Sequence, residues 1–227
     1  MFSSSFSFRT NLVIVMVGLP ARGKTYTARR LARYLSWLGY NANVFNVGNY
    51  RREQVGRLVH HSFFDPQNAD GIAARRRAAM DALDDLLRWM REEDGQIGIY
   101  DATNSTRERR RLVRERCAAA GVDVLYLEII CQDPEIIEAN ILETKLTSPD
   151  YMGISPEDAV QDFRARIAHY EDAYETIDDT GLCFIKLIDV GRQMVINRIE
   201  SYLMSQVVHF LTNLTIIPRP IWLTRHG

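Results

Sequence analysis

The sequence has few cysteines and no long hydrophobic run. Its three cysteines, Cys117, Cys131 and Cys183, lack the spacing of metal ligands, which argues against a structural zinc site and fits a reducing compartment. The longest apolar run, Leu12–Val17, has the length of a strand and is too short to cross a bilayer. We therefore expect a cytoplasmic protein with no membrane partner.

Excess charge is also missing, because 28 Lys and Arg residues stand against 29 Asp and Glu residues, for a net charge of −1. Nucleic acids and anionic membranes attract basic proteins, so neither is expected as a partner. Residues 1–10 lack the basic start and apolar core of a secretory signal and are expected to form a disordered tail. The remaining length suits one sizeable α/β domain.

Short apolar runs alternate with longer amphipathic stretches, which is the pattern of a parallel sheet flanked by helices. Strands are predicted at about 12–17, 43–47, 97–101, 122–130, 183–189 and 219–224, with helices between them. Helix starts are indicated by the capping-box spacing from Ser105 and by the pairs Asp133-Pro134 and Ser155-Pro156.

A phosphate-binding motif follows the first predicted strand. The segment is Gly18-Leu19-Pro20-Ala21-Arg22-Gly23-Lys24-Thr25, and a helical pattern begins at its end. In such a loop the backbone N–H groups bind the β-phosphate, Lys24 reaches the β and γ oxygens, and the Thr25 hydroxyl ligates Mg²⁺. This context disfavours a glycine-rich turn that binds nothing. It predicts a P-loop NTPase-type α/β fold, with a mostly parallel sheet and helices on both faces, that uses ATP and Mg²⁺.

Asp101 ends a predicted strand, and Thr103 and Asn104 follow it on a loop at the carboxyl edge of the sheet, where open α/β sheets bind ligands. Phosphoryl transfer needs an acidic group near the metal. Asp101 can hold Mg²⁺ or accept the proton of the attacking hydroxyl, and spacing does not separate these roles. A capping role for Asp101 is disfavoured because Ser105 is already the cap candidate.

Arginines gather at 51–52, 75–77 and 107–111, and guanidinium groups suit an acceptor that carries phosphate. Arg166 and Tyr170 are spaced to share a helix face. Most arginines are nevertheless solvated, and neighbours on a helix point to different sides, so the sequence alone does not choose among them. By themselves, Cys131 and Lys145 indicate a small buried residue and a solvated helix end.

Together these features resemble the kinase domain of the 6-phosphofructo-2-kinase/fructose-2,6-bisphosphatase family, from about Asn11 onward. The strongest matches are Gly18 to Tyr26, Val44-Phe45-Asn46-Val47-Gly48, Asp101-Ala102-Thr103-Asn104, Ser148-Pro149-Asp150-Tyr151 and Ile188-Asp189-Val190-Gly191. The resemblance implies ATP as donor, fructose 6-phosphate as acceptor, fructose 2,6-bisphosphate as product, and a homodimer. Asn49 departs from the acidic residue common in the family.

The resemblance also implies roles for single residues. ATP contacts are expected from Gly18 to Tyr26 and from Asn140 to Lys145, with Asp101 and Cys131 in the active centre. Lys24 and Lys145 would spread the transition-state charge, and Thr25 and Asp101 would hold the metal. The fructose 6-phosphate site would comprise Arg51, Arg75, Thr103, Arg109, Lys145, Arg166 and Tyr170.

The same resemblance divides the chain into the tail, a kinase domain at 11–217 and a segment at 218–227 that resembles the first strand of a truncated histidine-phosphatase domain. That segment contains His226 but not the surrounding pocket, so no phosphatase activity is expected of this chain. Two alternatives stay open: a P-loop kinase for another anionic acceptor, such as a nucleic-acid end, and a nucleotide-binding regulatory module without catalysis. The net charge disfavours the first, and Lys24, Thr25 and Asp101 disfavour the second.

Overall fold

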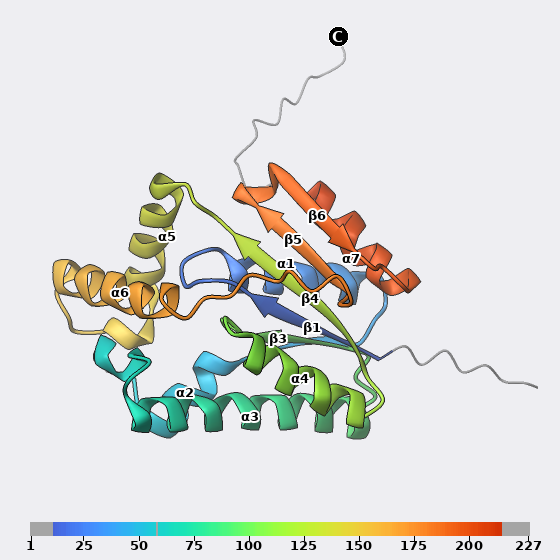
Figure 1. The fold of residues 1–227 in the computed structure, drawn as a ribbon, viewed down its shortest axis with the longest axis horizontal. Coiled ribbons are helices and arrows are strands. Elements are labelled where there is room, and N and C mark those ends of the chain that lie inside the picture. Colours follow the sequence, from blue (N-terminus) through green and yellow to red (C-terminus); the bar gives the residue numbers. More distant parts are fainter. Residues whose placement is uncertain (1–10, 58, 215–227) are drawn as a thin grey trace, which may run out of the picture.

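The computed structural model describes residues 11–57 and 59–214, with the backbone alone at 144–147. The described chain is built around one six-stranded sheet in the order β2-β3-β1-β4-β5-β6 (Figure 1). The strands are β1 Leu12–Val17, β2 Ala42–Asn46, β3 Ile97–Asp101, β4 Asp123–Ile130, β5 Phe184–Ile188 and β6 Gln193–Asn197. Strands β1 to β5 pair in parallel, and β6 runs antiparallel to β5. The predicted mostly parallel α/β sheet is therefore confirmed.

Helices cover both faces of the sheet, as predicted. The helices are α1 Lys24–Trp37, α2 Val47–Val55, α3 Ala69–Glu92, α4 Arg107–Ala119, α5 Pro134–Thr147, α6 Pro156–Glu171 and α7 Tyr202–Asn213, with short 3₁₀ helices η1 His61–Phe64, η2 Pro149–Tyr151 and η3 Asp189–Gly191. One hydrophobic cluster joins α1 and α7 to one face of the sheet, and a second joins α3 and α4 to the other. In the described ranges, no helix is long and apolar enough to cross a membrane.

Strand β1 is apolar throughout because both of its faces are covered. Leu12, Ile14 and Met16 point to the α1 side, and Val13 and Val15 point to the α3 side. All of these side chains are at most 2% exposed. The strand is thus a rigid support for the loop that follows its carboxyl end.

A third cluster lies beyond the carboxyl ends of the strands, where α5, α6, η1 and η2 gather (Figure 1). It is formed by Ile141 of α5, Tyr151 of η2, and Phe163 and Ile167 of α6. Its position opposite the β1–α1 loop places a second layer of side chains over the edge of the sheet where parallel α/β folds bind ligands.

Two details of the prediction are wrong. Strand β6 was missed: left-handed backbone at Asp189, Val190 and Gly191 turns the chain back after β5, so that Gln193–Asn197 pairs as a short edge strand. The cap of α4 is Thr106 and not Ser105, since the Thr106 side chain accepts from the Arg109 N–H at 3.2 Å. The strand predicted at 219–224, the segment 218–227 and the tail 1–10 lie outside the described residues.

Candidate active site

The phosphate loop follows β1 and is held tightly against the sheet. Gly18 has φ of 137°, and a Cβ at this position would lie 2.4 Å from the Ile129 carbonyl oxygen, so only glycine fits. Its N–H donates to the Thr103 carbonyl at 3.0 Å. Helix α1 then starts at Lys24 with no side-chain cap on its N-cap residue, Gly23, and no acidic residue in its first turn. Helices α3, α4, α6 and α7 carry side-chain caps, whereas α1 and α2 do not, so the uncapped N-terminus of α1 beside the glycine loop suits an anion.

Lys24 lies inside this loop rather than on the surface. Its Nζ donates to the Leu19 carbonyl at 2.5 Å, and the residue is 8% exposed. Burial lowers the pKa of Lys24 to about 8, against the carboxylate of Asp101, which acts to raise it, and with the cations of Arg22 and Arg166, which lower it further. The site therefore holds more positive charge than it can easily stabilise, and an anion would relieve this.

Asp101 closes the opposite side of the loop from the end of β3. Its Oδ2 accepts from the Thr25 hydroxyl at 2.8 Å and from the Asn46 Nδ2 at 2.6 Å. Asn46 is the register partner of Asp101 across the β2–β3 pair. A hydroxyl and a carboxylate oxygen at this separation fit two neighbouring ligands of Mg²⁺, since octahedral geometry with bonds of about 2.1 Å puts adjacent oxygens about 3 Å apart.

The other residues predicted for the nucleotide site lie in the loop or on the elements after β4. Asn140 of α5 donates from Nδ2 to the Ala21 carbonyl at 3.1 Å, so α5 reaches the P-loop. Arg22 donates to the Pro20 carbonyl at 3.0 Å and pairs with Glu171 at 3.4 Å. Cys131 is buried just after β4, close to Arg22. Burial lowers the pKa of Arg22, and Cys131 is among the neighbours that act to raise it. Lys145 lies in α5, and its side chain is outside the described part of the structure.

A second group of charges surrounds Asp150 of η2. Its carboxylate pairs with Arg51 at 2.7 Å, with Arg52 at 3.4 Å and with Arg166 at 3.4 Å. Burial acts to raise the pKa of Asp150, but the three guanidinium groups outweigh it and hold the pKa below its usual value. The group of three guanidinium cations and one carboxylate has a net charge of about +2, which suits a phosphate dianion.

Phe64 of η1 lies at the centre of the same group. The Arg166 guanidinium carbon sits 3.7 Å from the centre of its ring, and those of Arg51 and Arg75 sit 5.9 Å away. The Tyr170 ring is 6.0 Å away, and Arg75 donates to the Phe64 carbonyl at 2.9 Å. Cation–π contact of this kind holds guanidinium groups without neutralising them.

The comparisons with known proteins agree with this geometry. The sequence model described as 6-phosphofructo-2-kinase matches residues 3–218. The chain belongs to this family. It is 44% identical over 218 residues to 6-phosphofructo-2-kinase/fructose-2,6-bisphosphatase 4 of Rattus norvegicus, covering 95% of this chain and 46% of that protein. It is 42% identical over 224 residues to the Caenorhabditis elegans 6-phosphofructo-2-kinase/fructose-2,6-bisphosphatase, covering 95% and 49%. The chain thus spans about half the length of the curated relatives it matches.

A solved structure supports the fold. The Mycobacterium tuberculosis APS kinase in complex with AMPPNP and APS superposes with a TM-score of 0.57 at 16% sequence identity, covering 89% of this chain and 98% of that one. At this identity the likeness concerns the fold alone, which is the P-loop kinase architecture predicted from the sequence.

The structure brings together only part of the sugar-phosphate site that the family resemblance implies. Arg51, Arg75, Arg166 and Tyr170 surround Phe64, as described above. Thr103 lies beside the phosphate loop, through its carbonyl contact with Gly18. Arg109 is on α4 beside Tyr100, where burial raises the pKa of the tyrosine and Arg109 opposes this. No contact in the described residues joins Arg109 to the group around Asp150, so its assignment rests on the family resemblance.

Sequence reasoning missed three residues of the site. Asn46 and Asp150 stand in matched motifs without an assigned role, and Phe64 was not considered. Asn46 could have been found from its place at the end of a strand beside β3. The Asn49 that departs from the family accepts from Arg52 at 2.6 Å, and so helps to direct an arginine of the Asp150 group.

Replacing Asp150 with asparagine is expected to lower the free energy of unfolding by about 3 kcal/mol, because it leaves the buried Arg51 without its counter-charge. Since the folded pKa of Asp150 lies below its unfolded value, its contribution is present above about pH 4 and is lost as pH falls through the folded pKa. The Asp150→Asn variant should therefore lose less stability in acid than the parent.

Urea denaturation between pH 3 and pH 7 measures both effects. Asp172→Asn, at an exposed carboxylate at the end of α6, is the matched control and should change stability little. An Asp150→Asn variant as stable as the parent at pH 7 would show that the arginines are held by other contacts.

Proposed function

We propose that the chain is a 6-phosphofructo-2-kinase that transfers the γ-phosphoryl group of ATP to the 2-hydroxyl of fructose 6-phosphate, forming fructose 2,6-bisphosphate. The observation that carries this proposal is the adjacency of two anion sites. Ala21 of the phosphate loop packs against the hydrophobic cluster that contains Tyr151, next to Asp150, and Phe163, whose ring centre lies 5.6 Å from the Arg166 guanidinium carbon. The charge of Arg166 accordingly acts to lower the pKa of Lys24. A donor phosphate in one site and an acceptor phosphate in the other would thus share one cationic region.

The donor side is formed by the loop and α1. The N-terminus of α1 offers backbone N–H groups to the β-phosphate, and Lys24 offers one cation to the β and γ oxygens. Asn140 braces the loop from α5 through the Ala21 carbonyl. Because these groups are already in place, little reorganisation is needed when charge moves toward the leaving oxygen.

Thr25 and Asp101 are the residues that would hold Mg²⁺, as their oxygen donors and 2.8 Å separation fit its coordination. When bound, the ion supplies charge stabilisation to the β and γ phosphate oxygens. Asp101 can instead accept the proton of the attacking hydroxyl, and Asn46 orients its carboxylate for either task.

On the acceptor side, Arg51, Arg75 and Arg166 would bind the 6-phosphate, with Tyr170 beside them. Holding that phosphate positions the sugar so that its 2-hydroxyl lies in line with the γ-phosphorus, which converts a bimolecular encounter into a positioned reaction. Lys145 and Cys131 are assigned to the site by the family resemblance. A thiol has no evident task in phosphoryl transfer, so we assign Cys131 a packing role next to Arg22.

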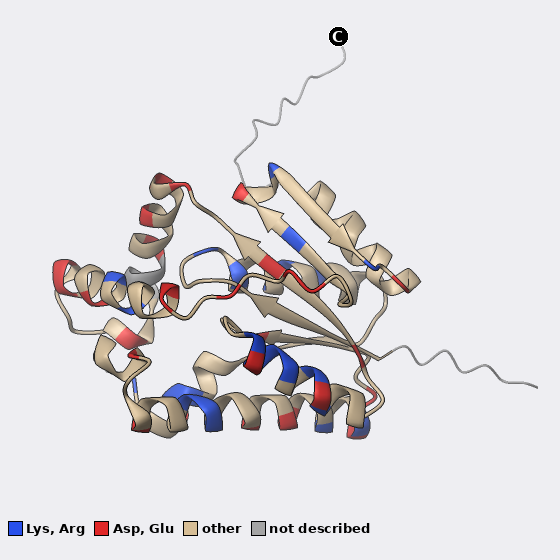
Figure 2. Cartoon of the chain, viewed as in Figure 1, with Lys and Arg blue, Asp and Glu red and all other residues tan. Residues whose placement is uncertain are grey.

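Incubation with ATP, Mg²⁺ and fructose 6-phosphate tests the proposal, with ³¹P and ¹³C NMR to identify the phosphorylated carbon. Phosphorylation at C2 is the expected result. Turnover of a nucleic-acid 5′ or 3′ end instead would support the alternative P-loop kinase. Nucleotide binding without transfer to any acceptor would support the silent regulatory module. Helix α4 is net basic, with six arginines and two glutamates (Figure 2), but Arg107, Arg111 and Arg116 are each paired with a carboxylate, which weakens the attraction of this helix for a nucleic acid.

The pH dependence of kcat/KM for ATP should report the titration of Lys24. Only the protonated lysine binds phosphate oxygens, and its pKa of about 8 in the free protein means that kcat/KM falls as pH rises through this value. The pKa should rise in the nucleotide complex, because phosphate favours the charged form, so kcat itself should fall only at higher pH. Steady-state kinetics from pH 6.5 to 9.5 measure both profiles, and coincident profiles would contradict the assignment.

The resemblance to the family also supports a homodimer and a cytoplasmic location as proposals. Sedimentation equilibrium of the purified chain over a range of concentrations tests the first, and fractionation of cells that express the protein tests the second.

A further inference from the structure

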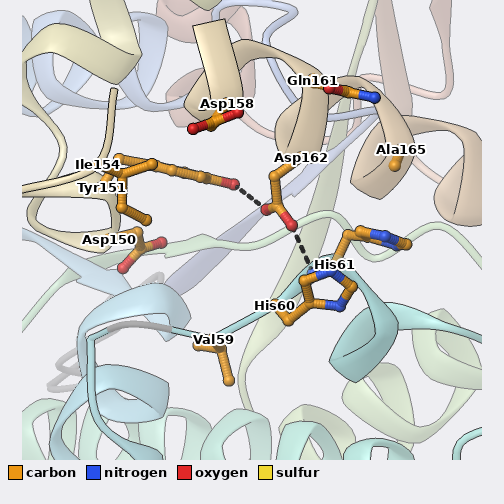
Figure 3. Close-up of a pocket in the computed structure, with 10 residues that line it drawn as sticks. All are labelled: Val59, His60, His61, Asp150, Tyr151, Ile154, Asp158, Gln161, Asp162 and Ala165. Carbon is orange, nitrogen blue, oxygen red and sulfur yellow. Dashed lines mark hydrogen bonds between the residues drawn. The ribbon is translucent and has the colours of Figure 1, made fainter. Parts of the chain in front are cut away.

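Histidines gather beside the Asp150 group in a way that the proposed reaction does not use. His60 and His61, at the start of η1, face Asp162 of α6, and one ligand atom from each of the three lies within 4.8 Å of the others. They line a cavity of about 470 Å³ together with Tyr151 and Asp158 (Figure 3). Three of the five histidines in the sequence take part in this region, since His169 also contacts His61.

The contact between two of these histidines has the dimensions of a metal site. The Nδ1 of His61 and the Nε2 of His169 are 3.2 Å apart. Two nitrogens bound to one tetrahedral Zn²⁺ at about 2.05 Å are separated by about 3.3 Å. Without an ion, a hydrogen bond joins the two rings, with one nitrogen donating its N–H to the other. A divalent ion bound between the two nitrogens would replace that proton.

Neighbouring groups already orient the other ligands. Asp162 accepts from the Tyr151 hydroxyl on Oδ2 and from the His61 backbone N–H on Oδ1, each at 2.8 Å. The Nδ1 of His60 accepts from the Ser62 backbone N–H at 3.3 Å and lies 3.0 Å from the Ser62 hydroxyl, so the ring is held in place beside Asp162. Outer partners of this kind fix the tautomer and direction of metal ligands.

We propose that His60, His61 and Asp162 bind one divalent transition-metal ion of the zinc class, with His169 as a fourth ligand through its contact with His61. This ion would be separate from the magnesium position at Thr25 and Asp101. Imidazole nitrogens with a single carboxylate select Zn²⁺ or Co²⁺ over Mg²⁺ and Ca²⁺, which prefer oxygen ligands. The ion would clip η1 to α6. Since η1 carries Phe64 and α6 carries Arg166, the clip would steady the arginines of the Asp150 group.

Titration of the tag-free chain with Co²⁺, without nucleotide, tests the site directly. The expected result is a visible d–d absorption of tetrahedral intensity that saturates at one ion per chain and is abolished by Zn²⁺ but not by millimolar Mg²⁺. His61→Ala and His169→Ala should each weaken Co²⁺ binding about tenfold or more. His209→Ala, at an exposed histidine of α7, is the matched control and should leave binding unchanged.

Three outcomes would overturn the proposal. These are the absence of saturable Co²⁺ binding, equal binding by the parent and the His61→Ala/His169→Ala double variant, and an intense thiolate-to-metal band, which would place the ion on a cysteine. Circular dichroism of each variant shows whether it folds, and His60→Ala provides a second test at an exposed ligand whose loss leaves the His61–His169 pair intact. None of these measurements depends on kinase activity, so they stand whether or not the chain phosphorylates fructose 6-phosphate.

Discussion

Replacing Lys24 with methionine is expected to lower kcat for phosphoryl transfer by about 10²- to 10³-fold. Lys24 is the cation inside the phosphate loop, where it is buried and held by the Leu19 carbonyl. Charge that develops on the β and γ oxygens in the transition state would lose its nearest positive partner. Because the loop excludes water, the solvent cannot replace that partner.

The fold should survive this substitution. At pH 7 the protein bears the cost of burying a charged amine, which is why burial lowers the pKa of Lys24 to about 8. This cost disappears as pH rises from about 8 toward the ordinary lysine value, and methionine, with a similar length and no charge, removes it at every pH. The Lys24→Met variant should therefore unfold at the same urea concentration as the parent or a higher one.

Arg33→Met is the matched control, because it removes one positive charge from the exposed side of the same helix. Its kcat should stay within about twofold of the parent, in line with the small effect of solvated surface charges. If Lys24→Met turned over as fast as the parent, the phosphate loop would not be the donor site, and the regulatory-module hypothesis would regain support.

Replacing Asp101 with asparagine is expected to lower kcat by about 10²- to 10⁴-fold, whichever of its two roles is correct. Asparagine keeps the shape of the side chain and one acceptor oxygen, so the contacts from Thr25 and Asn46 to Oδ2 can survive in part. The negative charge and the basic oxygen are both lost.

The magnesium dependence separates the two roles. If Asp101 holds the metal, the Asp101→Asn variant should need a higher Mg²⁺ concentration for half-maximal activity, and excess Mg²⁺ should restore part of kcat. If Asp101 is the base, the Mg²⁺ requirement should be unchanged, and the pH dependence of kcat should differ from that of the parent. Titration of kcat with Mg²⁺ at several pH values measures both.

Asp123→Asn serves as the control, because Asp123 is an exposed carboxylate at the amino end of β4, away from the ligand edge of the sheet. It should behave as the parent in both titrations. Activity of Asp101→Asn within a few-fold of the parent would rule out both roles and leave Asp101 as a brace for Thr25 and Asn46.

The nucleotide half of the site was predictable because its parts are local or follow from topology. A glycine-rich loop of this spacing between a buried strand and a helix typically binds phosphate, and Lys24 and Thr25 are adjacent at its end. Asp101 followed from the rule that parallel strands present their carboxyl ends along one edge of the sheet. The predicted bounds of β1 to β5 also agree closely with the observed ones, because these strands are mostly apolar runs between more polar helices.

The acceptor half was not predictable from local pattern. Arg51 and Asp150 are 99 residues apart in sequence, and Asp150 and Arg166 lie on different elements, yet the three meet in one buried group. Helical spacing could say that only one or two arginines of each run face inward, but not which. Burial against Phe64 and pairing with Asp150 make that choice, and both depend on how η1, η2 and α6 pack beyond the sheet.

By itself, then, the sequence determined the P-loop α/β fold, the phosphate loop and the position of Asp101, because short-range spacing and strand order are written along the chain. Only the tertiary structure decided which arginines converge, that Phe64 supports them, that Arg109 lies beside Tyr100, and that His60 and His61 meet Asp162 and His169. The physical reason is the same in each case. The free energy of these contacts comes from burial and charge pairing between segments distant in sequence, which no local pattern encodes.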